Sequence, residues 1–154
     1  MPSITYSINI AKPIDEVYAI TQDYHVRYEW DPFPEHIEMM DGATEIAIGT
    51  QVKVVAKSGL EMVVEFVQVK PPHVAAIRMI KGPVILDTFA GSWLLKSLPD
   101  NATRVTFKYS LKSKKWALPW ITDKLLSWYF GSKVKARLNG LATYCQNLPS
   151  EKVN

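Results

Sequence analysis

The sequence predicts an α+β domain in which a curved antiparallel β-sheet wraps around one long C-terminal α-helix, with one or two short helices after the first strand. Two observations predict this architecture. Apolar and polar residues alternate along 4–10 and along most of 51–111, with turn residues between the runs, which is typical of antiparallel strands. Across 118–148 the apolar residues recur at helical spacing instead. A sheet with one apolar face buries that face against such a helix.

The length and composition fit a single domain. The chain has 154 residues, of which 47% are hydrophobic and 21% are charged, and a chain of this length buries a sizeable core without disulfides or metals. We expect one domain over residues 1–149 and a disordered tail over 150–154. The single cysteine, Cys145, cannot form an internal disulfide, and the N-terminus lacks the basic and apolar regions of a signal peptide. Both features indicate a cytoplasmic protein.

The first third of the chain predicts a strand, one or two short helices and a corner. Apolar and polar residues alternate along 4–10, as in a half-buried strand. In KPIDEVYAI (12–20), Pro13 suits a first helical turn and the two acids favour the positive end of the helix dipole. The two prolines of YEWDPFP (28–34) rule out a continuous helix and predict a tight corner.

From residue 51 onward the chain reads as strands that reverse at short turns. Turn residues cluster at 58–59, 70–73, 81–83 and 99–101, and each cluster is short enough for its flanking strands to pair antiparallel. The predicted strands are 51–57, 60–69, 75–80, 84–98 and 105–111. This spacing indicates an antiparallel meander.

The last third predicts one long helix. Its apolar stripe is formed by Ile121, Leu125, Trp128, Val134, Leu138, Leu141, Cys145 and Leu148. Gly131 and Ser132 interrupt the stripe near the middle of the helix, where small residues can kink it or leave room beneath it.

The charges are unevenly distributed along the chain. Residues 1–50 hold two basic and nine acidic residues, whereas 51–154 hold 16 basic and six acidic residues. The basic excess peaks in KSKKW (112–116) and KVKAR (133–137). A nucleic acid or an anionic membrane surface could use such a patch, but a solvated helix face carries the same pattern. Since the net charge is only +3, we expect no nucleic-acid partner.

No catalytic or metal-binding motif stands out. The three histidines do not have the spacing of metal ligands, and no second cysteine assists them. Ser92 lacks the G-x-S-x-G pattern of a hydrolase nucleophile, and no glycine-rich phosphate loop is present. We therefore expect no metal and no cofactor, and no catalytic residue is assigned.

The alternation predicts which side chains point toward the helix. The inward apolar set is Val54, Met62, Val64, Phe66, Met79, Phe89, Trp93 and Phe107 from the strands, with Trp128 and Leu138 from the helix. Composition does not distinguish a filled core from a lined cavity.

Three polar residues interrupt the apolar strands. Tyr109 shares the parity of Phe107, so its hydroxyl is expected to reach the interior. Asp87 points inward by strict alternation unless a bulge intervenes, whereas Arg78 is expected to point outward. Tyr109 and Asp87 are therefore the candidates for polar chemistry.

The order of elements and several local motifs resemble the START-like helix-grip superfamily (SRPBCC), within it the polyketide cyclase/dehydrase and lipid-transport group. The residues that carry the resemblance are IAKPIDEVYAITQDYHVRYEWDP (10–32), IGT (48–50), FAGSW (89–93), PDNATRVTFKY (99–109) and RLNGLATYC (137–145). The resemblance covers nearly the whole chain. It is specific for fold and uninformative about chemistry, because the superfamily hosts cyclases, aromatases, lipid carriers and hormone receptors.

The resemblance implies an internal cavity of a few hundred Å³ between the sheet and the C-terminal helix. It also implies that DYHVRYEWDPF (23–33) forms a second short helix and a turn, with Trp30 packed under the helices and Asp31 closing the turn. Phe33 would line the cavity mouth. In cyclase relatives Tyr, Trp and Arg side chains orient a polyketone chain, which favours Tyr109 and Trp93 here.

Three functions compete at this level. The first is binding or transport of a hydrophobic small molecule such as a lipid, quinone, fatty acid or polyketide. The second is a polyketide cyclase, aromatase or dehydratase that uses the same cavity. The third, compatible with the first, is docking to a membrane surface through 114–130, where Trp116 and Trp120 lie beside lysines.

Overall fold

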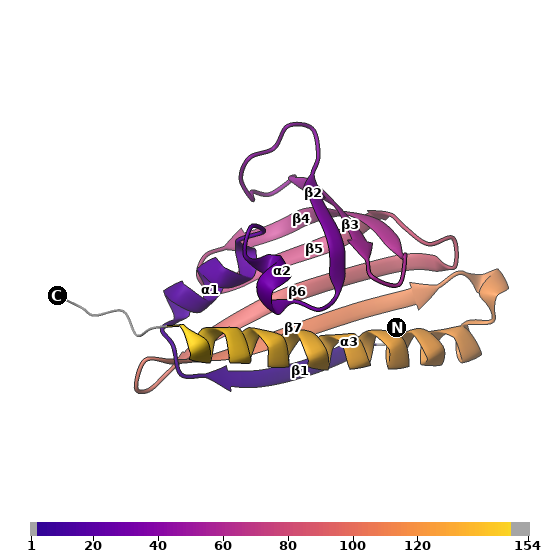
Figure 1. Cartoon of the computed structure of the whole chain (residues 1–154). Helices are drawn as coiled ribbons and strands as arrows, with labels where there is room; N and C mark the ends of the chain where they lie inside the picture. Colours follow the sequence, from indigo (N-terminus) through magenta and orange to yellow (C-terminus); the bar gives the residue numbers. More distant parts are fainter. Residues whose placement is uncertain (1–2, 149–154) are drawn as a thin grey trace.

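A computed structural model describes residues 3–148, and it confirms the predicted α+β architecture of a curved antiparallel sheet and a long C-terminal helix (Figure 1). The expected tail at 150–154 lies outside the described residues. The strands form one antiparallel sheet in the order β1-β7-β6-β5-β4-β3-β2. The elements are β1 (Ser3–Ile10), α1 (Ile14–Gln22), α2 (Arg27–Trp30), β2 (Pro34–Met39), β3 (Gln51–Ala56), β4 (Glu61–Lys70), β5 (Val74–Lys81), β6 (Leu86–Leu98), β7 (Ala102–Ser113), the 3₁₀ turn η1 (Lys115–Ala117) and α3 (Pro119–Asn147).

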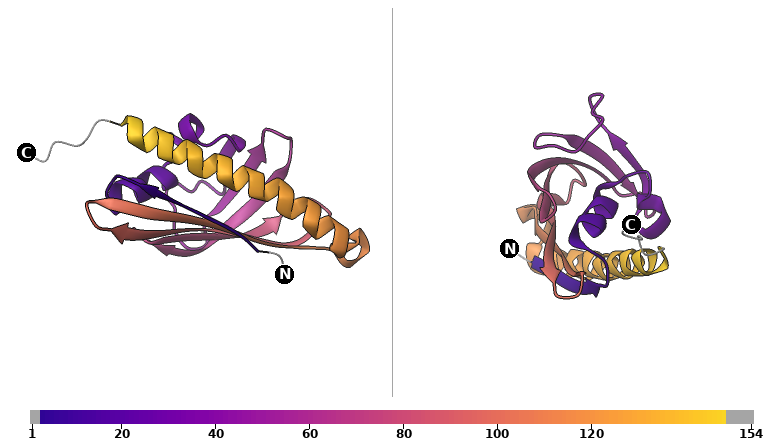
Figure 2. Two further views of the ribbon diagram at one scale, coloured as in Figure 1. Left: turned by 90° about the horizontal axis from the view of Figure 1, so that it is seen from below. Right: turned by 90° about the vertical axis from the view of Figure 1, so that its left-hand side faces the viewer.

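The sheet curls so that its concave face is closed by helices (Figure 2). Helix α3 packs along β1 and β7, and α2 packs against α3. Alternation along β7 places Val105, Phe107, Tyr109 and Leu111 on the buried face. The space between the sheet, the α2 corner and α3 is where the core and the candidate site lie.

The sequence did not predict strand β2, because the predicted corner ends at Pro34 and no strand is expected between it and residue 51. Pro34 begins the strand, and the pairing with β3 slips in register between Pro34 and His36. Proline cannot donate a ladder hydrogen bond and is tolerated at a sheet edge, and β2 is an edge strand. Because of the prolines and this register slip, the segment lacks the regular alternation of apolar and polar residues from which a strand is predicted.

The predicted apolar stripe of α3 is wrong in its first half. Val134, Leu138, Leu141 and Cys145 are buried, whereas Ile121, Leu125 and Trp128 are exposed, with Trp128 76% exposed. The step from Trp128 to Val134 spans six residues and does not fit the three-to-four repeat of a helix face. The buried face instead continues toward the N-terminus through Phe130.

Two further findings concern the described residues only. No helix within residues 3–148 is long and apolar enough to cross a membrane. In the same part of the chain, no three His, Cys, Asp or Glu side chains come together as a metal site would require.

Candidate functional site

A small cavity of about 90 Å³ lies between the concave face of the sheet, the corner after α2 and helix α3. Most of its lining is apolar, and the polar exceptions are Gln22, Tyr24, Arg27, Tyr109 and Arg137. Nine of the residues expected to contact a ligand line it, namely Phe33, Val54, Met62, Val64, Phe66, Phe89, Trp93, Phe107 and Tyr109. Their contact with a ligand remains a prediction.

Three expected lining residues lie elsewhere. Trp128 points to solvent, Leu138 is buried in the helix–sheet contact, and Met79 packs against the core beyond the cavity. Helix α3 contributes Phe130 and Arg137 to the lining instead. These two residues are seven positions apart, or two helical turns, so they lie on one face.

Asp87 does not reach the interior. The pairing of β6 with β7 shifts register between Leu86 and Thr88, and Asp87 and Thr88 are both exposed while Leu86 and Phe89 are buried. A bulge of this kind breaks strict alternation. Arg78 points outward as expected and pairs with Glu65 at 3.0 Å.

The cavity is smaller than the few hundred Å³ that the resemblance implied, because aromatic side chains occupy much of the interior. Trp93 packs edge-on against Trp30 and Phe107, with ring centroids 5.9 and 4.3 Å apart. A second hollow, a groove of about 810 Å³, lies between α1, β2 and the connection from β2 to β3. It shares Gln22, Tyr24 and Ile37 with the cavity and so borders it on the outside.

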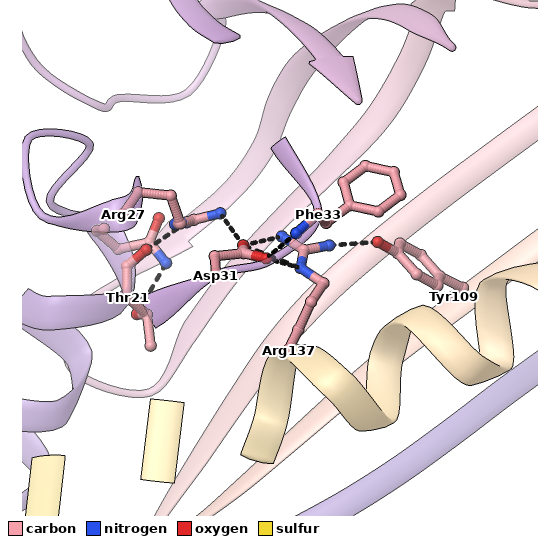
Figure 3. Close-up of polar contacts among 7 residues, drawn as sticks. Thr21, Arg27, Asp31, Phe33, Tyr109 and Arg137 are labelled. Atoms are coloured by element: carbon pink, nitrogen blue, oxygen red, sulfur yellow. Dashed lines mark hydrogen bonds and ion pairs between the residues drawn. The ribbon is translucent and has the colours of Figure 1, made fainter. Parts of the chain in front are cut away.

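The polar end of the cavity is a buried network centred on Asp31 (Figure 3). Asp31 follows α2, and the single Nε–H of Arg137 is shared between its two carboxylate oxygens, which lie 3.1 and 3.0 Å from Nε, while Nη2 of Arg137 lies 2.9 Å from the carboxylate. Nη1 of Arg27 lies 3.4 Å from the same carboxylate. Asp31 also accepts from the backbone N–H of Phe33 at 3.0 Å, so it closes the turn as the resemblance implied and holds both arginines as well.

Aromatic rings surround the two guanidinium groups. The guanidinium of Arg27 lies 5.1 Å from the ring centroids of Tyr24 and Trp30, and that of Arg137 lies 4.8 Å from Phe107. Such cation–π contacts offset part of the cost of burying a cation. Arginine stays charged in proteins, so the network holds two positive groups against one carboxylate.

Burial is the largest single influence on the pKa values of Arg27, Arg137 and Tyr109. It lowers the pKa of Arg27, and Asp31 offsets only part of that effect. Burial also acts to lower the pKa of Arg137, but Asp31 and Tyr109 outweigh it and the pKa is raised. Burial raises the pKa of Tyr109 despite the nearby Arg137, so Tyr109 is a neutral phenol at pH 7.

Tyr109 is held in one orientation by this network. Nη1 of Arg137 donates a hydrogen bond to its hydroxyl oxygen, and its ring packs on Phe89 with centroids 4.8 Å apart. Because Arg137 has no acceptor, the phenol proton of Tyr109 is not used in that hydrogen bond. A carbonyl or carboxylate oxygen in the cavity could accept it.

Sequence reasoning missed Arg27 and Arg137. Among the described residues, the buried side-chain nitrogens without a hydrogen-bond partner are Nε of Arg27 and Nε1 of Trp30. One signal was present, since Arg137 follows Val134 by three residues and so interrupts the buried face of the last helix. Its partner Asp31 is 106 positions away, and nothing in a single sequence links the two.

Comparison with solved structures shows the fold. An aromatase/cyclase from Streptomyces sp. R1128 aligns over 94% of this chain and 93% of its own, with 18% identity and a TM-score of 0.79. A START superfamily protein from Mycobacterium smegmatis aligns over 96% of this chain and 99% of its own, with 10% identity and a TM-score of 0.78. Norcoclaurine synthase from Thalictrum flavum aligns over 94% of both chains, with 13% identity and a TM-score of 0.72.

The sequence comparisons give the family. No curated protein matches the chain. The family described as "polyketide cyclase / dehydrase and lipid transport" matches residues 1–146, which is nearly the full length and includes every cavity-lining residue. The cavity, the helix-grip architecture and this match lead to one conclusion: the chain belongs to the polyketide cyclase/dehydrase and lipid transport family.

Proposed function

We propose that the protein binds an amphipathic small molecule, with an acidic head group against the buried arginines and an apolar body in the cavity and the bordering groove. The observation that carries the proposal is the excess of one positive charge in a buried network that lines an apolar cavity. Long-chain carboxylic acids have this chemistry. In this reading the protein is a carrier or binder.

The charge balance supports an anionic group. A buried charge without a counter-charge is costly, and Arg27 is held less well than Arg137. Its Nη2 donates to the backbone carbonyl of Thr21, but its Nε has no partner, and its approach to Asp31 is the longer of the two. A ligand carboxylate beside Arg27 would give two negative groups for two positive groups, and the phenol of Tyr109 could donate to the same oxygens.

The apolar surfaces support a hydrocarbon body. The cavity walls carry phenylalanine, methionine and valine side chains from β3, β4, β6 and β7. The groove adds tyrosine, isoleucine and methionine side chains from α1, α2 and β2. Because the cavity volume is only about 90 Å³, the head and the first carbons would occupy the cavity and the remaining chain would follow the groove.

The test compares decanoate with 1-decanol, which share the hydrocarbon chain and differ in the head group. We expect decanoate to bind about tenfold to a hundredfold more tightly, because a hydrogen bond to a charged group contributes about 1.5–3 kcal/mol. Titration can be followed by tryptophan fluorescence, since Trp93 lines the cavity. Arg27→Gln should abolish the preference, whereas the matched control Arg78→Gln, on the outer face of the sheet, should retain it.

Two results would contradict the proposal. Equal affinities for decanoate and 1-decanol would show that the site does not recognise an acidic head group. Failure of both compounds to bind would remove the apolar cavity as a binding site for molecules of this class.

A second candidate function is cyclisation of a poly-β-ketone, and the orientation of Tyr109 favours it. In an intramolecular aldol step, an α-carbon that has lost a proton attacks a carbonyl, and a proton donor at that carbonyl neutralises the oxygen as the C–C bond forms. The neutral phenol of Tyr109, fixed by Arg137, has a free proton inside the cavity. The structural likeness to an aromatase/cyclase is a likeness of fold only.

Tyr109→Phe tests this second candidate. The substitution keeps the ring and its packing on Phe89 while it removes the hydroxyl. If the protein is a cyclase, turnover of a poly-β-ketone thioester should fall by about 10²–10⁴-fold with little change in substrate binding. An unchanged rate in the variant, or no turnover by the wild-type protein, would reject the cyclase function.

A further inference from the structure

A cluster of exposed apolar side chains covers one tip of the molecule, away from the cavity. Helix α3 begins there, next to η1, while its C-terminal end lies at the opposite tip (Figure 2). We call this cluster the tip surface. It consists of Trp116, Leu118, Trp120, Ile121, Leu125 and Trp128, which are 40–76% exposed, and none of them lines the cavity or the groove.

The fold does not require these side chains to be apolar. Positions 121, 125, 128, 132, 135 and 139 follow each other at three- and four-residue steps, so they share the outward face of α3. The first three positions are Ile121, Leu125 and Trp128, and the last three are Ser132, Lys135 and Asn139, all six exposed. One face of one helix is therefore apolar in its first half and polar in its second half. Clustered exposed apolar side chains of this kind mark interaction sites.

Lysines surround the tip surface. Lys112, Lys115 and Lys124 are exposed, and among the ion pairs found within residues 3–148 none involves a lysine of the tip. Asp123 is the single acidic residue between Ala102 and Asn147. Its carboxylate accepts hydrogen bonds from the backbone N–H and the hydroxyl of Ser113, at 2.9 and 2.5 Å, so it binds the end of β7 and forms none of these ion pairs.

We infer that the tip surface docks on a membrane that contains anionic lipids. Tryptophan partitions to the boundary between headgroups and acyl chains, and neighbouring lysines pair with anionic headgroups. The apolar outward half of α3 would enter the interface, and the polar second half would remain in water. This inference concerns a surface distinct from the cavity and does not depend on the proposed ligand.

The charges favour a membrane over a second copy of the chain. In a twofold dimer the same patch meets itself, so Lys115 and Lys124 would approach their own copies without acids to neutralise them. Like charges placed together across an interface oppose association. An anionic lipid surface supplies the missing negative charge.

Co-sedimentation of the full chain with lipid vesicles tests the inference. One set of vesicles contains phosphatidylcholine alone, and the other contains phosphatidylcholine and phosphatidylglycerol in a three-to-one ratio. We expect binding to the second set at about 0.1 M salt and loss of binding at about 1 M salt, because the Debye length falls from about 10 Å to about 3 Å.

Variants assign the binding to the tip surface. Trp120→Ser/Trp128→Ser should weaken binding by about tenfold or more, and both tryptophans are exposed, so the fold should be retained. Lys124→Gln should weaken binding by about fivefold, whereas the matched control Lys135→Gln, on the outward face of the second half of α3, should change it little.

Three outcomes would overturn the inference. The first is no sedimentation with phosphatidylglycerol vesicles at low salt. The second is an equal loss of binding in Lys124→Gln and Lys135→Gln. The third is a dimer, detected by light scattering without vesicles, that the double tryptophan variant dissociates, which would assign the tip surface to self-association.

Discussion

Replacing Asp31 with asparagine should lower the free energy of unfolding by about 3–5 kcal/mol, because breaking a buried ion pair leaves charge uncompensated. The side chain of Asp31 is fully buried, and it is the one carboxylate that faces Arg27 and Arg137 in the network. Asparagine has nearly the same shape and can still accept from the N–H of Phe33. The decrease in the free energy of unfolding, measured by urea unfolding, therefore reports the missing negative charge.

Glu65→Gln is the matched control for this variant. It removes a carboxylate from another arginine pair, but Arg78 is 61% exposed in that pair. An exposed ion pair contributes about 0–1 kcal/mol. Similar losses in Asp31→Asn and Glu65→Gln would show that the buried network is not held together by charge.

Gly140→Ala is expected to destabilise the protein by about 3 kcal/mol or more, at the upper end of the cost of overpacking. The backbone of α2 approaches α3 at Gly140, and a methyl group there would overlap the carbonyl oxygen of Trp30 and lie 3.2 Å from its carbonyl carbon. A backbone atom cannot rotate away as a side chain can. The substitution would push apart the two elements that carry Asp31 and Arg137.

Gly131→Ala in the same helix provides the control. A methyl group at Gly131 would meet Ile4 at 3.7 Å and Tyr6 at 3.9 Å, which are ordinary contacts. Alanine is favoured over glycine in a helix by about 0.8–1 kcal/mol, so this variant should be more stable than the wild-type protein. Thermal unfolding of both variants measures the contrast, and destabilisation by Gly131→Ala equal to that by Gly140→Ala would contradict it.

The fold could be predicted because its strands are half-buried and its turns are short. Along β7, Phe107, Tyr109 and Leu111 alternate with exposed residues, and a period of two is visible within a few residues. Strand β2 could not be predicted, because it contains Pro34 and a register slip. The prediction that Asp87 points inward was wrong for the same reason, because the register shift in the pairing of β6 with β7 breaks the alternation of inward and outward side chains.

The candidate site could be predicted only in its apolar part. Strand residues such as Phe66 and Phe89 line the cavity because alternation sets their direction. The polar end depends on Asp31 and Arg137, which are 106 positions apart, and such a pairing leaves no local pattern. The buried face of the first half of α3 was also predicted wrongly, because the exposed apolar residues of the tip surface recur at the same helical spacing as a buried stripe.

The central claim, that a ligand carboxylate pairs with the buried arginines, is tested most directly by ¹³C NMR of carboxyl-labelled decanoate bound to the protein. Two neighbouring guanidinium groups favour the ionised form, so the carboxyl pKa of the bound acid should be lower than that of free decanoate. Arg27→Gln should move this pKa upward. A bound carboxyl whose pKa is equal to or higher than that of the free acid would contradict the account, because it would place the head group away from the arginines.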